Sequence, residues 1–363
     1  MNGTVDFVQL MATLRQDPQA AARAAAAAGH RVVGYVGNDI PVELIIAGNS
    51  LPVRLRGVDA ATPGADGFLE SSFAPDVRSI TQQWLAGALD HLHSVVFPRG
   101  DDSAQRLYYY LCELQRRGVC AGPRPLLFDV AGLPRGASFE HTLESTRLLA
   151  AQLGAGTDAL APAIERVRQR EELLRAVQAR RLLPAPLPGS AASDCTFAAG
   201  CDWRSTFDDA ARRWLEAAAL LPMPRRVVLA GDPPPDNQLH IAIEATGASL
   251  VLELTESSAA GERSSRDPLA AIATDFQRRE SPALSMRSNA RWLADRALDQ
   301  RADAIVIWLG EHNEALPWEI ARQMKSLRDA GIPALLLARQ PWRIPATTLA
   351  QVMHFVRAPG EHR

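Results

Sequence analysis

A histidine beside two carboxylates is the best candidate for acid–base chemistry in this 363-residue sequence. His312 stands in the segment GEHNEALPWE with Glu311 and Glu314, directly after an apolar run at residues 304–309. Imidazole titrates near neutral pH and responds to nearby carboxylates, so His312 and Glu314 are candidate catalytic residues. Acidic residues also complement the dipole at a helix start, so a structural interpretation of this segment stays open.

A second polar segment, GDDSAQRLYYY at residues 100–110, follows another apolar run and supplies Asp101 as a third candidate catalytic residue. A short acceptor such as Asp101 also caps a helix, which is the structural alternative. Loop arginines meet phosphates or carboxylates, although most are simply solvated. The candidate substrate-binding residues are Asn38, Asp39, Asp102, Ser103, Arg106 and Arg263.

Cysteine, metal and nucleotide motifs are missing. The four cysteines are too few and too scattered for a disulfide framework, and the spacing of Cys195 and Cys201 matches no common zinc pattern; the other two are Cys112 and Cys120. No glycine-rich dinucleotide or P-loop fingerprint occurs, and neither does a serine-nucleophile elbow or an H-E-x-x-H motif. The motifs alone therefore predict no metal and no bound nucleotide.

Charge and hydropathy narrow the class of partner. Thirty-nine basic and 41 acidic residues give a formal net charge of −2, so no basic excess favours nucleic acid. The N-terminus lacks the basic and apolar regions of a secretory signal, and the apolar runs are too short to span a membrane. We therefore expect a cytoplasmic protein with no membrane or nucleic-acid partner.

Eight short apolar runs alternate with longer helical patterns, which predicts parallel sheets covered by helices on both faces. An alanine-rich stretch at residues 18–29 predicts a helix that ends at Gly29. A further helical pattern at residues 142–183 predicts a long connector. The expected strands are residues 31–36, 52–55, 94–97, 125–130, 226–230, 249–254, 304–309 and 333–337.

The two halves of the sequence resemble each other. Residues 32–55 and 227–254 both read as strand, Gly-Asn/Asp-x-x-Pro turn, helix, glycine and strand. This predicts two doubly wound, Rossmann-like α/β domains facing each other across a ligand-binding cleft. The expected divisions are an N-terminal helical segment (1–30), a first α/β domain (31–141), a helical connector and linker (142–193) and a second α/β domain (194–363).

Several segments together resemble the 2-hydroxyacyl-CoA dehydratase and benzoyl-CoA reductase subunits, the D-component family. VVGYVGNDIPVELIIAGNSLPVRLRG is similar to the family's opening strand, helix and second strand. FAPDVRS resembles its cysteine-containing "CPFVRS" segment, and VVFPRGDDSAQRLYYY its strand–"CDS"–helix segment. AIERVRQREELLRAV, RVVLAGDPPPDNQL and the region from ADAIVIWLGEHNEALPWE onwards continue the resemblance in order.

The resemblance implies an acyl-CoA substrate, a lyase reaction, a heterodimer or homodimer with a family subunit, and a 4Fe-4S cluster held by cysteines. Against the family pattern, the cluster cysteines fall at Gly37, Ala74, Asp101 and Asn313. Oxygen ligands are poor substitutes for thiolates in iron–sulfur sites. We therefore expect no cofactor in this chain.

Three functional hypotheses follow. The first is a cluster-free family subunit, non-catalytic or repurposed, that keeps an acyl-CoA-type cleft. The second is an active dehydratase or reductase subunit whose cluster ligands come from a partner chain or from cysteines aligned differently. The third is a cluster-free acyl-CoA hydrolase or hydratase that uses Asp101, His312 and Glu314. A binding module for a small molecule unrelated to CoA also stays open.

Overall fold

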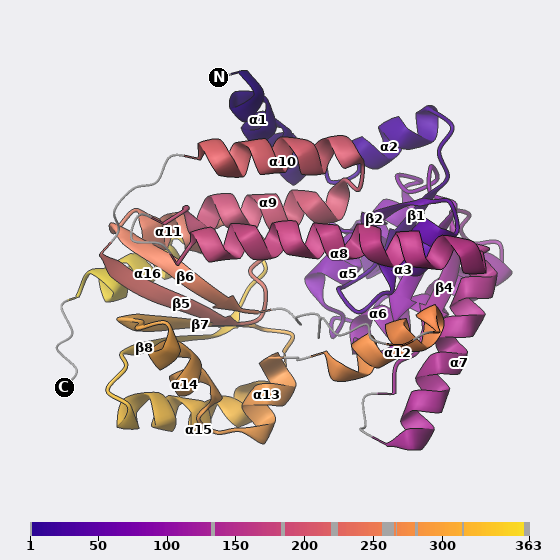
Figure 1. The fold of residues 1–363 in the computed structure, drawn as a ribbon. Coiled ribbons are helices and arrows are strands. Elements are labelled where there is room, and N and C mark those ends of the chain that lie inside the picture. Colours follow the sequence, from indigo (N-terminus) through magenta and orange to yellow (C-terminus); the bar gives the residue numbers. More distant parts are fainter. Residues whose placement is uncertain are drawn as a thin grey trace. The chain divides into compact units, whose positions relative to one another are not determined.

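The computed structural model describes residues 2–131, 135–182, 186–218, 224–255, 265, 267–279, 282–313 and 316–358 (Figure 1). The chain forms two compact units. Unit 1 comprises Met1–Leu173, Phe197–Trp214 and Ala259–Arg279, and unit 2 comprises Leu174–Thr196, Leu215–Ser258 and Glu280–Arg363. The domain limits expected at residues 30, 141 and 193 stay predictions.

Each unit contains one four-stranded, all-parallel sheet with the same pattern of strand order. In unit 1 the order is β2-β1-β3-β4, and in unit 2 it is β6-β5-β7-β8. The prediction of two doubly wound α/β domains is therefore confirmed, and all eight expected strands are present. Their bounds are β1 Val32–Tyr35, β2 Leu51–Arg54, β3 Ser94–Pro98, β4 Arg124–Phe128, β5 Arg225–Gly231, β6 Ala248–Leu254, β7 Ala304–Gly310 and β8 Ala334–Gln340.

Helices connect the strands and cover the sheets (Figure 1). Those of the first half are α1 Asn2–Gln16, α2 Ala20–Ala27, α3 Val42–Ala47, α4 Pro63–Asp66, α5 Pro75–Leu85, α6 Asp102–Arg116, α7 Gly136–Leu153 and α8 Thr157–Arg180. The others are α9 Gly189–Cys201, α10 Ser205–Ala217, α11 Gln238–Glu244, α12 Pro268–Arg278, α13 Pro282–Ser288, α14 Trp292–Asp299, α15 Leu316–Asp329 and α16 Ala346–Arg357.

The apolar strands are explained by burial on both faces of each sheet. Along β1, Val32 packs into one hydrophobic cluster and Val33 into the cluster on the opposite face. Along β5, Val228 packs into the hydrophobic cluster on one face of the sheet and Val227 into the cluster on the opposite face. Successive side chains of a strand point to opposite faces, so a strand covered on both sides is apolar at most of its positions.

The expected long connector is two helices rather than one. The chain leaves α7 at Gly154, whose φ of 74° is left-handed, and enters α8 three residues later. Glycine adopts this conformation without steric cost, so it ends the helix. α7 then packs on the sheet of unit 1, where Leu149 and Leu153 are buried in its core.

A buried ion cluster fastens α8 to α9 and α10 within unit 1. The guanidinium of Arg170, 2% exposed, lies 2.5 Å from Asp208 and donates to the carbonyl oxygens of Ala199 and Asp202. Arg166 pairs with the second oxygen of Asp208 at 2.5 Å. A buried carboxylate with two guanidinium partners satisfies charges that would otherwise be costly to desolvate.

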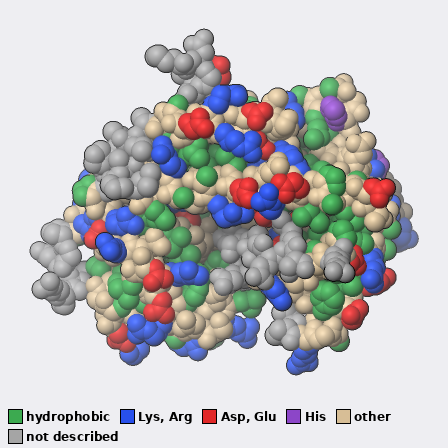
Figure 2. Space-filling view, in the orientation of Figure 1, with side chains coloured by type: hydrophobic (Ala, Val, Ile, Leu, Met, Phe, Trp, Pro, Cys, Tyr) green, Lys and Arg blue, Asp and Glu red, His purple; other side chains and the backbone are tan. Residues whose placement is uncertain are grey.

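The surface shows no single-signed stripe on the face seen in Figure 2, where basic and acidic side chains are intermixed. In the part of the chain that the structure describes, no helix is both long and apolar enough to cross a bilayer.

Candidate functional site

The strand order places a topological switch point in each sheet. β1 and β5 lie in the middle of their sheets, with the next strand on one side and the following one on the other. Loops at the carboxyl ends of such strands diverge, and this is where open α/β sheets bind ligands. The segments to examine are therefore those after β1 and β3 in unit 1 and those after β5 and β7 in unit 2.

In unit 2 the switch point is organised around Asp232, the residue that follows β5. Its carboxylate accepts a hydrogen bond from the backbone N–H of Gly310 at 2.8 Å and from the side-chain amide of Asn313 at 2.5 Å. The backbone N–H of Asp232 donates to the Trp308 carbonyl at 2.8 Å. Asp232 thus ties the loop after β5 to the loop after β7.

His312 lies beside this carboxylate. Its ring packs against Gly310 so closely that a β-carbon at residue 310 would come within 2.6 Å of the imidazole. Burial raises the pKa of Asp232, while the bonds from Gly310 and Asn313 and the charge of His312 oppose that rise. His312 itself is exposed. A half-buried carboxyl group beside an exposed imidazole is an arrangement that can hold and move a proton.

The switch point of unit 1 holds Gly37, Asn38 and Asp39. Gly37 has a left-handed φ of 73°, and a β-carbon there would lie 3.5 Å from the ring of Pro98, the last residue of β3. The guanidinium of Arg279 donates to the Asn38 carbonyl at 2.9 Å and lies 3.9 Å from the Asp39 carboxylate. Arg279 therefore fixes the conformation of the loop after β1.

Arg279 is held in place in turn by α12. It pairs with the buried carboxylate of Asp275 at 3.2 Å and stacks over the Phe276 ring at 3.6 Å.

The sequence reading missed both Arg279 and Asp232. In the sequence, Asp232 follows Gly231 as Asn38 follows Gly37 in the first half of the chain. The resemblance between the two halves could therefore have pointed to Asp232. Nothing local marked Arg279, which is 241 residues from its partner Asn38.

Asp101 acts as a helix cap. Its side chain accepts a hydrogen bond from the backbone N–H of Ala104 at 2.7 Å at the start of α6. The hydroxyl of Ser103 accepts from the backbone N–H of Ala74 at 3.1 Å, which links the start of α6 to the start of α5. These contacts bear out the structural interpretation of the segment. Whether Asp101 has a second, catalytic role stays a prediction.

Asp102 and Arg106 are engaged with each other and with a neighbouring turn. Asp102 is 82% exposed and lies 3.6 Å from the Arg106 guanidinium one helical turn later. Arg106 also donates to Glu70 at 2.8 Å and lies 4.1 Å over the Phe73 ring. The remaining candidates, Glu314 and Arg263, lie outside the described residues.

The candidate catalytic residues do not share one unit. Asp101 belongs to unit 1 and His312 to unit 2. Within unit 2, the structure brings His312 to Asp232, a partner that the sequence reading did not name. It is this pair, rather than the three residues expected, that the described geometry assembles.

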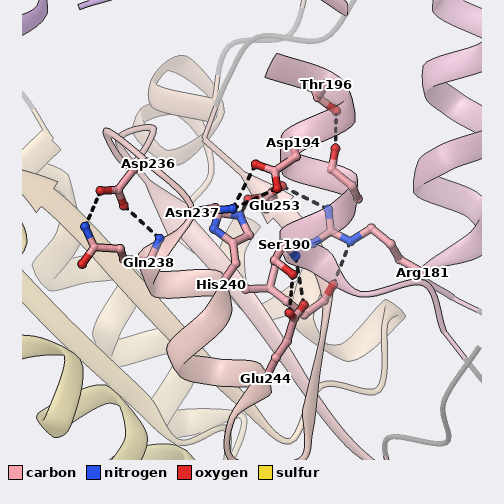
Figure 3. A network of polar contacts seen from close by, with 12 residues as sticks. Arg181, Ser190, Asp194, Thr196, Asp236, Asn237, Gln238, His240, Glu244 and Glu253 are labelled. Atoms are coloured by element: carbon pink, nitrogen blue, oxygen red, sulfur yellow. Dashed lines mark hydrogen bonds and ion pairs between the residues drawn. The ribbon is translucent and has the colours of Figure 1, made fainter. Parts of the chain in front are cut away.

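A polar network supports the loop that carries Asp232 (Figure 3). At the far end of that loop, the side chain of Asn237 donates to both carboxylate oxygens of Asp194, at 2.9 and 3.0 Å. One turn into α11, the buried ring of His240 contacts Glu253 of β6. These contacts bind the start of α11 to its surroundings in unit 2 and so fix where the loop ends.

Glu253 is the centre of charge in this network. Its carboxylate also pairs with the fully buried guanidinium of Arg181 at 3.0 Å, and Arg181 donates to the Leu250 carbonyl at 2.8 Å (Figure 3). Burial alone would raise the pKa of Glu253, but Arg181 and His240 outweigh it and lower the pKa to about 2. The carboxylate therefore stays ionised and keeps both partners.

The side chains at the four expected cluster positions do not fit an iron–sulfur cluster. Gly37 and Ala74 have no ligand atom, and Asp101 and Asn313 offer only oxygen or amide groups. None of the four cysteines occupies one of these positions; Cys195 and Cys201 are buried within α9. Among the described residues, no three His, Cys, Asp or Glu side chains gather as a metal site would require.

The comparison with protein families identifies the scaffold. The family model of the 2-hydroxyglutaryl-CoA dehydratase D-component matches residues 38–340. The chain belongs to this family. The match covers the strands of both units from the loop after β1 to the end of β8, so the resemblance read from the sequence is confirmed. No curated protein matches this D-component family member.

Proposed function

We propose that this D-component family member is a cluster-free subunit that binds a CoA thioester and does not perform radical dehydration by itself. One observation carries the proposal. Each of the four positions where the family pattern calls for a cluster cysteine has another residue, and three of these residues, Gly37, Asp101 and Asn313, have a structural role of their own.

Those roles would obstruct a return to cysteine. At Gly37 the left-handed backbone strains any residue with a β-carbon. Asp101 caps α6 through a carboxylate oxygen, an acceptor that cysteine lacks. Asn313 joins Asp232 to the start of α15, where its side chain accepts from the Leu316 N–H at 3.0 Å. These contacts support the proposal that the chain holds no cluster at these positions.

The test is anaerobic purification followed by a visible spectrum and assays of iron and acid-labile sulfide. We expect a colourless protein without stoichiometric iron or sulfide, which nonetheless binds acetyl-CoA. Stoichiometric iron and sulfide would overturn the cluster-free assignment. Loss of colour in Cys195→Ala or Cys201→Ala would then assign those cysteines as ligands, and colour only in the presence of a second family subunit would assign ligands to that partner.

A second candidate function is favoured by the Asp232–His312 pair. The two side chains lie together at the switch point of unit 2, and an imidazole oriented next to a half-buried carboxyl group can act as a general base. In this reading the chain is a hydrolase or hydratase that acts on a CoA thioester without a cluster. Water would lose its proton to His312, and Asp232 would stabilise the resulting imidazolium.

Turnover of an acyl-CoA panel distinguishes the two candidates. If the chain is a hydrolase or hydratase, His312→Ala abolishes turnover and Asp232→Asn lowers it and shifts its pH profile. Glu319→Gln on the following helix, at a partly exposed residue that pairs with Arg322, serves as the control. Turnover that survives His312→Ala would remove His312 as the base, and absence of turnover in the wild type leaves the binding-subunit proposal in place.

A further inference from the structure

A carboxylate and a guanidinium meet at the carboxyl ends of β3 and β4 in unit 1. Arg99 is the residue after β3, and Asp129 is the residue after β4. The last residues of these parallel strands, Pro98 and Phe128, are paired in register, and the backbone N–H of Arg99 donates to the Phe128 carbonyl at 3.0 Å. The register of the sheet therefore places Arg99 and Asp129 next to each other.

His141 joins this pair from the second turn of α7. Its Nε2 lies 2.9 Å from Oδ2 of Asp129, and the guanidinium of Arg99 bonds to the same oxygen. One turn further along α7, the hydroxyl of Ser145 accepts a hydrogen bond from the backbone N–H of Asp129 at 2.9 Å. These contacts join three separate segments and hold the imidazole and the guanidinium at one carboxylate oxygen.

The contact with Asp129 determines which nitrogen of His141 can react. A carboxylate only accepts hydrogen bonds, so Nε2 carries the proton and, in the neutral ring, Nδ1 keeps the lone pair. In the part of the chain that the structure describes, Nδ1 has no hydrogen-bond partner, and the side chain is 49% exposed. An imidazole that a carboxylate orients through its other nitrogen is a nucleophile within reach of solvent.

Arg99 adds a group that recognises anions. Its guanidinium bonds to Asp129 through Nη1, and its side chain is 51% exposed. The remaining N–H groups of a guanidinium match the oxygen atoms of a phosphoryl group in geometry and charge. Because the imidazole and the guanidinium are both half-exposed, the arrangement suits a phosphorylated donor that approaches from solvent.

We propose that His141 is a modification site, at which Nδ1 accepts a phosphoryl group from a small-molecule donor such as a phosphoramidate or an acyl phosphate. The Nδ1 lone pair attacks phosphorus and forms the new N–P bond. The bond from phosphorus to the leaving group breaks, and the leaving ammonia or carboxylate takes the electron pair. Asp129, as a positioning residue, stabilises the imidazolium through Nε2–H, and Arg99 binds the phosphoryl oxygens.

The test treats the full chain with phosphoramidate and, separately, with acetyl phosphate, and follows phosphohistidine by phosphorus NMR and mass spectrometry. We expect one phosphoryl group on Nδ1 of His141, formed about tenfold faster than on His93, the difference that one charge-assisted hydrogen bond supplies. His93 is the internal control, because it is exposed and lies 3.3 Å from Arg31 but contacts no carboxylate among the described residues. Equal rates at the two histidines, or no reaction of His141 with either donor, would overturn the proposal.

Variants distinguish activation of His141 from a purely structural contact. Asp129→Asn and Arg99→Gln should each slow the reaction at His141 by about tenfold, since each removes a charge-assisted contact. Asp129→Asn should also divide the product between Nδ1 and Nε2, which phosphorus NMR resolves, whereas a loss of stability alone would not change the nitrogen that reacts. Asp129→Glu keeps a carboxylate and should recover part of the rate.

The matched control is Glu144→Gln on α7. It also removes one carboxylate near His141, but Glu144 pairs with Arg147 at 3.6 Å instead, so the change should not slow the reaction. Thermal melting of each variant confirms that it is folded. If Asp129→Asn reacts at Nδ1 as fast as the wild type, Asp129 does not activate His141 and the proposal is wrong.

Discussion

At the scale of single residues, the same side chains that suggest chemistry also hold the fold together. Asp101 caps a helix, and Arg106 donates to a glutamate and stacks over an aromatic ring. Asp232 and Arg279 differ from these, because their contacts shape the loops at the two switch points. Function in this chain is therefore best sought in residues that fix loop conformation.

Asp101 gives the first prediction. Replacement of a capping aspartate by alanine leaves a helix N–H unsatisfied, so Asp101→Ala should lower the free energy of unfolding by about 1 kcal/mol. Asp101→Asn and Asp101→Ser can still accept that hydrogen bond and should cost a few tenths of a kcal/mol. Urea denaturation measures all three. If the asparagine variant were as unstable as the alanine variant, the negative charge rather than the cap would be the stabilising feature.

Glu253 gives a prediction about pH. Its pKa of about 2 lies below the ordinary value of 4.5, so ionised Glu253 stabilises the fold at neutral pH. That contribution is complete above about pH 4.5 and is lost as the pH falls towards about 2. Glu253→Gln should cost about 3 kcal/mol at pH 7, because it leaves buried Arg181 without its counter-charge, and much less near pH 2.

Melting curves between pH 2 and pH 7 measure this effect. The matched control is Glu165→Gln on α8. The pKa of Glu165 is also about 2, because of its bond to Arg168, but both side chains of this pair are about half exposed to solvent. Water screens an exposed pair, so we expect little change in the melting temperature of that variant. Equal curves for Glu253→Gln and the wild type would show that the buried network contributes nothing.

At the scale of elements, the sequence predicts strands more reliably than it predicts contacts. The eight apolar runs are recognisable because both faces of each sheet are covered, which favours apolar residues along the strands. Asp232 and Asn313 are 81 residues apart and meet only because β5 and β7 are neighbours. Strand order is set by how the whole chain packs, so no local pattern could reveal this pair.

Two glycines of unit 2 provide a test of how closely the strands approach. Gly231 and Gly247 both have left-handed backbones, with φ of 104° and 82°. A β-carbon at Gly231 would collide with the Trp308 carbonyl oxygen, whereas at Gly247 it would meet nothing within 4 Å. Gly247→Ala should cost about 1 kcal/mol for backbone strain alone. Gly231→Ala should cost several times more by urea denaturation, and equal costs would contradict the close approach of β5 to β7.

At the scale of the whole molecule, the family assignment implies a cluster-bearing subunit, whereas the residues at the expected cluster positions imply a subunit without a cluster. The matched region, residues 38–340, runs through both units. The sequence alone was enough to infer the family, since that inference depends on the order of segments, while the cluster positions at Gly37, Ala74, Asp101 and Asn313 stay predictions. It could not reveal the hydrogen-bond partner of Asn313, because that bond joins two loops that are far apart in the sequence.

Thiol reactivity offers a test that reports on the folded chain as a whole. Cys195 and Cys201 are buried in α9, and the pKa of Cys201 is raised to about 11, so at pH 8 about one in a thousand of its thiols is ionised. Cys112 and Cys120 are partly exposed. We expect a disulfide reagent to modify at most two thiols in the native protein and all four in guanidinium. Rapid reaction of a third would show that α9 opens readily.

The division of the chain between its two units has a practical consequence for anyone who dissects this protein. The polypeptide passes from one unit to the other after residues 173, 196, 214, 258 and 279, so neither unit is one continuous stretch. Three of these passages fall inside α8, α9 and α10. No single truncation can therefore release an intact half, and a gene fragment that ends at any of these points encodes an incomplete core. To isolate either half, its segments would have to be reconnected by new linkers, and α8, α9 and α10 would each have to be cut.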